Sequence, residues 1–168
     1  MKLNQTFRMR KIITNTTPII SLLKVDKLNL LKELYEKVIV PTAVYLEIEN
    51  GKEKPYYQDL TQIDWIEIQE IRNPDSRAYF LDLDDGEAEV LILAKELNAD
   101  LVIMDEIMGR RYSKQLGFNL TGTIGILLKS KEKGLIISIK DLLTELIKKG
   151  TWLNPKLVSK AIQLANEE

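Results

Sequence analysis

Acidic side chains stand at points of this sequence where an apolar segment ends or an apolar helix begins. Asp84 and Glu87 open an apolar helical segment, and Asp105 with Glu106 directly follows the apolar run 101–104. The chain contains no histidine and no cysteine, which excludes a Ser-His-Asp triad, a cysteine nucleophile and a zinc site of the His/Cys kind. Carboxylate oxygens suit hard divalent cations such as Mg²⁺ or Mn²⁺, and these cations suit phosphate substrates. The sequence therefore predicts chemistry based on oxygen ligands.

The overall composition is that of an ordinary globular domain. The 168 residues are 45% hydrophobic and 29% charged, which is enough for one domain with a buried core. With 24 Lys+Arg against 25 Asp+Glu, the chain is no polycation that coats nucleic acid, so any basic site must be local. Because no apolar run approaches the length of a membrane span, we expect a cytoplasmic protein. We also expect a polar extension over residues 1–8, with the folded domain over residues 9–168.

Strand-like and helix-like segments alternate along the chain. Short β-branched or apolar runs predict strands at residues 11–14, 38–40, 65–68, 101–104 and 118–120. Longer apolar periodicities predict helices at residues 18–34, 41–49, 87–97, 107–116, 124–133, 139–148 and 155–166. We expect the polar segment 53–64 to be a loop with a short helix, and Asn73-Pro74 to mark a turn. Short strands separated by helices favour an α/β domain with a parallel sheet covered by helices on both faces.

Four polar residues are the main candidates for a site at one edge of that sheet. Ligands bind outside the carboxyl ends of parallel strands, where the strand order reverses. Asn15 follows the first strand and Asp105 the fourth, whereas Glu47 and Glu87 lie on helices. Glu47 and Glu87 both share the apolar stripe of their helix, so each carboxylate leans toward the buried side. An unpaired charge is costly there, and a metal ion would satisfy it.

Each acid also has a purely structural interpretation. Asp84 and Glu87 have the spacing of a helix capping box. Asp105 follows a strand and precedes a helix, so it could be the N-cap of that helix. Glu89 and Glu106 are weaker candidates, and we expect them at the rim of the site.

Basic and hydroxyl side chains near the same strand ends are candidates for substrate binding. Arg110, Arg111 and Lys114 follow Asp105 within one helix, where they could contact the phosphates of a nucleic acid strand. The alternative is that they form a solvated helix face. Hydroxyl groups that could cap helices, bind a phosphate or bind a metal-bound water are those of Thr16, Thr17 and Thr123.

Short segments spread over the chain together resemble the PIN-domain nucleases in order and spacing. The resemblance is closest to the DUF3368 branch of PIN domains, which is similar to the VapC-type toxins. It covers nearly the whole chain from Met9 onward. The segments that carry it are residues 14–20, 41–47, 86–89, 104–106, 109–111 and 122–125.

This resemblance implies a fold and an activity. The family has a five-stranded parallel sheet of order 3-2-1-4-5, which places the first and fourth strands side by side. It implies Mg²⁺- or Mn²⁺-dependent hydrolysis of RNA, with the cation held by Glu47, Glu87 and Asp105 and with Asn15 in the fourth place. It further implies the toxin of a toxin-antitoxin pair, a homodimer, and a small antitoxin protein that blocks the site.

Asn15 departs from the family pattern, in which the first strand ends in an aspartate. An asparagine still offers a carbonyl oxygen, but it removes one negative charge, so the affinity for a metal ion should fall. The chain could be a naturally degenerate nuclease, a weakened one, or a deliberately inactivated one. A competing hypothesis, which Asn15 supports, is a catalytically silent binding module that keeps the fold and the partner surface. A receiver-like phosphoacceptor domain also places acids at strand ends, but Asn15 stands alone after the first strand and disfavours that class.

Overall fold

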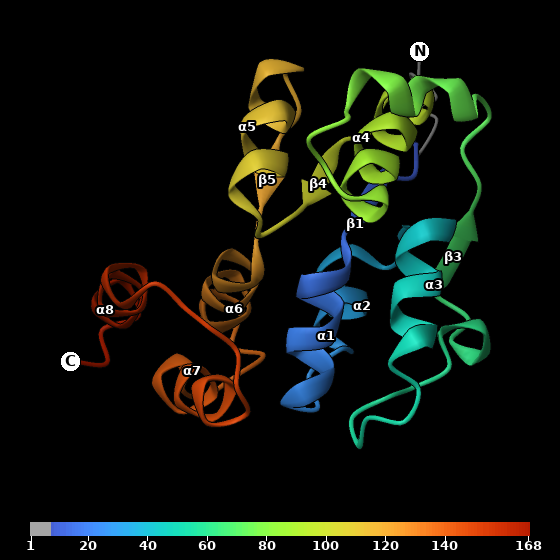
Figure 1. The fold of residues 1–168 in the computed structure, drawn as a ribbon. Helices are drawn as coiled ribbons and strands as arrows, with labels where there is room; N and C mark the ends of the chain where they lie inside the picture. Colours follow the sequence, from blue (N-terminus) through green and yellow to red (C-terminus); the bar gives the residue numbers. More distant parts are fainter. Residues whose placement is uncertain (1–7) are drawn as a thin grey trace, which may run out of the picture.

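Five parallel strands form one sheet in the order β3-β2-β1-β4-β5 in the computed structural model, which describes residues 8–168 (Figure 1). The strands are β1 (Ile12–Thr14), β2 (Val38–Pro41), β3 (Ile66–Gln69), β4 (Leu101–Ile103) and β5 (Leu120–Thr121). The order predicted from the family resemblance is confirmed. Thr14 lies opposite Ile103, so the carboxyl ends of β1 and β4 adjoin at the point where the strand order reverses.

The central strands are apolar because both of their faces are covered. Ile12, Ile13, Val102 and Ile103 are fully buried, as expected for a parallel sheet between helical layers. The polar extension that we expect at residues 1–8 falls, except for its last residue, outside the described residues.

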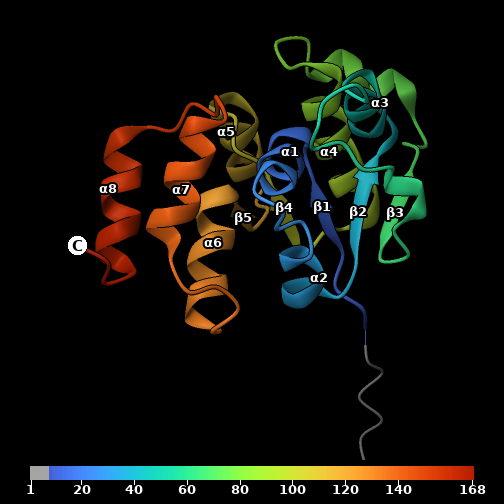
Figure 2. The ribbon, with the colours of Figure 1, turned by 90° about the horizontal axis from the view of Figure 1, so that it is seen from below.

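Helices connect the strands and cover both faces of the sheet. They are α1 (Thr16–Lys24), α2 (Leu30–Tyr35), α3 (Thr42–Asn50), α4 (Asp85–Leu97), α5 (Ile107–Gln115), α6 (Thr123–Glu132), α7 (Ile139–Lys148) and α8 (Pro155–Leu164). Helix α4 packs on β1 and β2 and contacts α3 and α5. Figures 1 and 2 show α7 and α8 beyond α6, to one side of the sheet. None of the helices described is long and apolar enough to cross a membrane.

The structure differs most from the predicted elements in three places. The predicted helix 18–34 is two helices, since Asp26 takes a positive φ of 54° between α1 and α2. The last strand begins at Leu120 rather than at residue 118. A 3-10 helix, η2 (Pro74–Tyr79), forms where only a turn was expected. The Asn73 side chain starts it by accepting a 3.1 Å hydrogen bond from the Asp75 backbone.

A second 3-10 helix, η1 (Leu60–Gln62), lies within the polar segment 53–64. The short helix expected in that segment is thereby confirmed.

Candidate functional site

Asn15 lies at the carboxyl end of β1 with only 2% of its surface exposed. Its backbone N–H donates to the Ile103 carbonyl at 2.9 Å, which fastens the end of β1 to β4. Its side-chain Nδ2 donates to Glu106 Oε2 at 2.9 Å. The remaining side-chain atom, Oδ1, is buried and accepts no hydrogen bond from any residue that the structure describes. Asn15 therefore has one satisfied end and one free acceptor.

Glu47 reaches the same place from α3. It is half-buried, and its Oε2 accepts a 2.6 Å hydrogen bond from Thr16 Oγ1. The backbone of Gly86, at the start of α4, faces both Glu47 and Asn15. A Cβ at position 86 would lie 2.4 Å from Glu47 Oε1 and 3.3 Å from Asn15 Oδ1. Glycine therefore lets α4 approach these two oxygens without displacing either side chain.

Glu87 is both a capping residue and a buried acid. Its carboxylate accepts a 3.1 Å hydrogen bond from the Asp84 backbone, while Asp84 Oδ1 accepts a 2.7 Å bond from the Glu87 backbone. The capping box that the spacing indicated is thus present at the start of α4. Glu87 nevertheless has only 7% of its surface exposed, as its place on the apolar stripe predicts.

Asp105 does not cap the helix that follows it. The N-cap of α5 is Glu106, without a side-chain capping bond. Asp105 instead accepts bonds from the backbone and the hydroxyl of Thr123, at 2.8 and 2.6 Å. It thereby caps α6 from the end of β4, which corrects the expected N-cap role at α5. Gly122 makes room for it, because a Cβ there would lie 2.5 Å from Asp105 Oδ1.

Glu106 belongs to the site and not to its rim. Its Oε2 accepts from Asn15, and its Oε1 accepts from Thr17 Oγ1. This contact joins α1 to the end of β4, and sequence reasoning ranked the residue too low. The one signal in its favour was its position, directly after Asp105 at a strand end.

Glu89 is buried as well, with 3% of its surface exposed. Its Oε1 accepts from the Ala43 backbone at 3.3 Å and pairs with Arg77 Nη2 at 3.1 Å. Glu89 is thus a buried acid with its own partners, and its expected place at the rim of the site stays a prediction. It fastens η2 to the start of α3.

Three acids of the candidate site, Glu47, Glu87 and Asp105, have raised pKa values. Burial is the main cause that raises the pKa of Glu47, of Glu87 and of Asp105 above the ordinary range. Repulsion from Glu106 adds to all three, whereas the hydroxyl bonds to Glu47 and Asp105 act in the opposite direction. The site thus collects negative charge that a cation would neutralise.

The donor chemistry of the site fits a hard divalent cation. Every candidate ligand is an oxygen, and the buried Oδ1 of Asn15 lacks a partner among the described residues. Across residues 8–168, however, no three carboxylates are placed so that they could hold one ion together. Hydroxyl and amide donors engage Glu47, Glu87 and Asp105 instead. Their convergence on a single cation stays a prediction.

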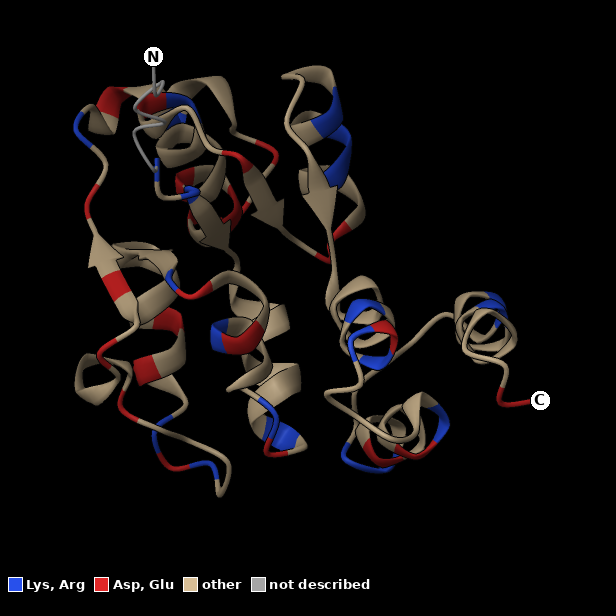
Figure 3. Ribbon diagram, turned by 180° about the vertical axis from the view of Figure 1, so that it is seen from behind, with Lys and Arg blue, Asp and Glu red and all other residues tan. Residues whose placement is uncertain are grey.

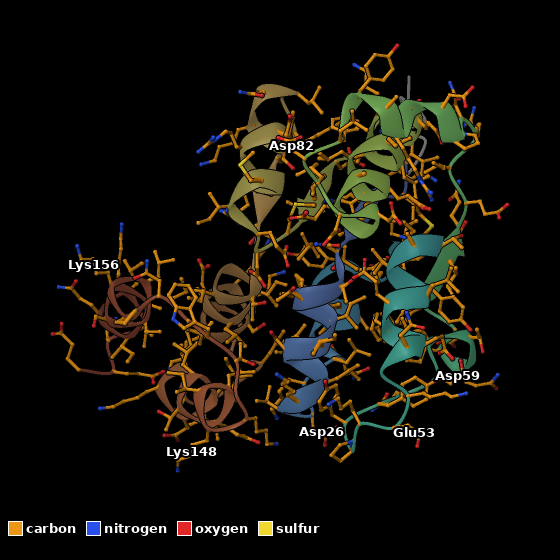
Figure 4. The ribbon with its side chains drawn as sticks, in the orientation of Figure 1. Asp26, Glu53, Asp59, Asp82, Lys148 and Lys156 are labelled. Atoms are coloured by element: carbon orange, nitrogen blue, oxygen red, sulfur yellow. The ribbon has the colours of Figure 1, made fainter. Side chains whose placement is uncertain are left out.

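The basic run on α5 divides into two parts. Arg110 is half-buried, and its Nη1 donates to the Met104 carbonyl at 2.8 Å, next to Asp105. Arg111 and Lys114 are exposed, and Figure 3 shows basic residues on the side of α5 that faces away from the domain. At the other side of α5, the Tyr112 hydroxyl donates to Asp82 at 2.9 Å, close to η2 (Figure 4).

The strand order and the acids at the junction of β1 and β4 define a PIN-type α/β domain. The sequence profile of DUF3368, a PIN domain family, matches residues 11–167. The chain therefore belongs to the DUF3368 family of PIN domains, which have a nuclease-type fold and generally use divalent metals. No curated protein matches the chain.

Proposed function

We propose that this protein is a Mg²⁺- or Mn²⁺-dependent ribonuclease of the PIN type. The observation that supports the proposal is that Asn15, at the end of β1, bonds to Glu106 in the segment after β4 and faces Gly86 together with Glu47 of α3. Asp105 directly precedes Glu106 in that segment. The carboxyl edge of such a sheet is where open α/β folds bind ligands. Family membership supports the same conclusion, because a PIN domain implies a nucleic acid substrate.

The proposed cation ligands are Glu47, Glu87, Asp105 and the Oδ1 atom of Asn15. When bound, a divalent cation supplies Lewis acidity that activates water and offsets charge developing on the phosphate. The protein side chains orient these groups. The Thr16 hydroxyl fixes the rotamer of Glu47, and Thr123 fixes that of Asp105.

Substrate phosphates would contact the exposed part of the basic run. Arg111 and Lys114 are free to reach a strand that passes the site, whereas Arg110 is anchored to the Met104 carbonyl. Arg110 would then add positive charge beside Asp105 without leaving its anchor. All three predicted threonines already donate to a carboxylate, Thr16 to Glu47, Thr17 to Glu106 and Thr123 to Asp105. Each hydroxyl would have to leave that bond to donate to a substrate phosphate.

The proposal extends to the biological setting. The resemblance of DUF3368 domains to VapC-type toxins supports a cytoplasmic toxin of a toxin-antitoxin pair. In this setting the protein would be a homodimer, and a small antitoxin protein would block the site until it is released.

A catalytically silent binding module is the second candidate. Asn15 lacks the charge of the family aspartate, and within the described part of the chain no three acids form a ready-made metal site. Both observations favour a domain that keeps the fold and the partner surface without cleaving RNA.

Cleavage of a generic structured RNA distinguishes the two candidates. The assay compares the unaltered chain with Asp105→Asn in Mg²⁺, in Mn²⁺ and in EDTA. Glu53→Gln is the matched control, because Glu53 is exposed in the loop after α3 and far from α5 (Figure 4). We expect cleavage that Mn²⁺ strengthens, and that EDTA and Asp105→Asn abolish. No cleavage even in Mn²⁺ would establish the silent module, and cleavage that survives both treatments would place the chemistry elsewhere.

A further inference from the structure

Helix α1 leads away from the candidate site with one partly exposed stripe. All of its residues are buried except Thr17, Ile20 and Lys24. Their spacing of three and four residues places them on one face of the helix. Thr17 donates to Glu106 in the site, and the rise of an α-helix puts Lys24 roughly 10 Å further along α1. The stripe therefore connects the site with the far end of α1 (Figure 1).

A pocket opens at that far end of α1. Three segments that are distant in the sequence form its walls, namely the end of α1, the loop after α3 and the end of α7. Two lysines, Lys24 and Lys149, and one acid, Asp26, line it. The half-buried rings of Tyr56 and Tyr57 form part of its wall. The pocket thus combines positive charge with aromatic surface, which is the combination that binds single-stranded nucleic acids.

The ammonium group of Lys24 is held in the pocket without a counter-charge. Its Nζ donates to Thr151 Oγ1 at 3.1 Å and lies 5.7 Å from the centre of the Tyr56 ring. None of the ion pairs found among residues 8–168 includes Lys24. Lys149 differs, because its Nζ pairs with Glu145 Oε1 at 2.7 Å. A half-buried cation that is positioned but not neutralised is best satisfied by an anionic ligand.

We propose that this pocket binds an unpaired nucleotide of the RNA strand, with its phosphate at Lys24 and its base against Tyr56 and Tyr57. This inference rests on the proposed nuclease function. It defines the substrate as RNA that is single-stranded beside the cleaved bond, because only an unpaired base can stack on an aromatic side chain. The strand follows the stripe of α1 from the site to the pocket. Lys24 therefore contributes to substrate binding and not to the chemical step.

Binding and cleavage of a labelled single-stranded RNA of about 12 nucleotides test the inference. Binding is measured by fluorescence anisotropy over a salt series in Mg²⁺, on the full chain carrying Asp105→Asn so that the RNA stays intact. Lys24→Gln removes the charge, and glutamine can still donate to Thr151. Tyr56→Leu removes the ring and keeps an apolar side chain. Lys148→Gln is the matched control, since it makes the same change of charge at an exposed residue of α7 that does not line the pocket (Figure 4), and circular dichroism verifies that each variant is folded.

We expect Lys24→Gln to reduce the log-log salt slope of binding by about 0.7 and to weaken binding about fivefold at about 0.1 M salt, because one phosphate contact is lost. Tyr56→Leu should weaken binding about fivefold or more and leave the slope unchanged, because stacking releases no counterions. In Mn²⁺-dependent cleavage by the chain with Asp105 intact, Lys24→Gln should raise KM about fivefold and leave kcat within about twofold, since the contact is the same in the ground state and the transition state. Lys148→Gln should change none of these quantities.

The possible failures are distinguishable. If RNA is cleaved but Lys24→Gln and Tyr56→Leu bind it like Lys148→Gln, the pocket is refuted and the proposed function stands. If Lys24→Gln weakens binding but leaves KM unchanged, the pocket holds a different strand from the one that is cleaved, which overturns the inference. If the unaltered chain cleaves no RNA while both pocket variants weaken binding, the proposed function is wrong and the pocket stands as an RNA-binding site.

Discussion

Gly86→Ala separates the stability of this domain from its ability to bind a metal ion. The added Cβ would lie 2.4 Å from Glu47 Oε1, which is closer than two such atoms can approach. The carboxylate is the far end of a flexible side chain, so we expect it to rotate away and leave the backbone of α4 in place. Its 2.6 Å bond from Thr16 would break.

The change in unfolding free energy should be small, because two effects oppose each other. Loss of a hydrogen bond to a charged, half-buried group costs about 1.5–3 kcal/mol. Alanine within a helix gains roughly 0.5–1 kcal/mol over glycine, and Gly86 is the second residue of α4. The net destabilisation should be about 1–2 kcal/mol, which lowers Tm by roughly 2–8 °C for a domain of this size. Mn²⁺ affinity should fall about tenfold or more, since Glu47 has left the site.

Urea unfolding and Mn²⁺ calorimetry on the same samples measure both quantities. Gly51→Ala is the control, because its Cβ would meet the Ile48 carbonyl at an ordinary 3.5 Å and its φ is −99°. It should leave Mn²⁺ affinity unchanged. Unaltered Mn²⁺ affinity in Gly86→Ala would refute the placement of Glu47 at the cation. A loss of more than about 4 kcal/mol would show that the backbone yields and not the side chain.

Three further predictions concern charge. Replacing Arg111 and Lys114 with alanine should reduce the log-log salt slope of RNA binding by roughly one unit or somewhat less per lost contact; an unchanged slope would mean that both are merely solvated. Burial alone would raise the pKa of Glu167, but its bonds from α6 and from the start of α7 lower it to about 2. The contribution of Glu167 to stability is therefore present above about pH 4.5 and is lost as the pH falls toward 2. In urea unfolding, Glu167→Gln should lower the free energy of unfolding by roughly 1–3 kcal/mol at pH 7 and change it little at pH 2. Burial raises the pKa of Asp105, so the ionised side chain destabilises the folded state, and in cation-free buffer Asp105→Asn should be the more stable form at pH 8. This difference in unfolding free energy should shrink as the pH falls and Asp105 takes up its proton. A difference that stays constant with pH would contradict a raised pKa.

Local patterns in the sequence were sufficient for the elements of the sheet. The run 38–40 is β-branched and stops before Pro41, and α7 was predicted with its observed bounds, 139–148. Such signals succeed because the side-chain period of a strand or helix is a property of neighbouring residues. The break at Asp26 was missed, because one residue with a positive φ leaves little trace in an apolar pattern. Strand order came from family resemblance and not from periodicity.

The sequence alone also indicated the chemical type of the site, since a chain without histidine and cysteine has only oxygen ligands to offer. It placed Asn15 and Asp105 at strand ends correctly. Only the tertiary structure decided which donor meets which acid. Asn15 and Glu106 are 91 positions apart, and they meet because β1 and β4 pair in one register, with Thr14 opposite Ile103. Glu89 is buried for a similar reason, as α4 packs against the start of α3. No local pattern encodes these pairings, because they arise from packing between distant segments, and the partners of each carboxylate follow from that packing.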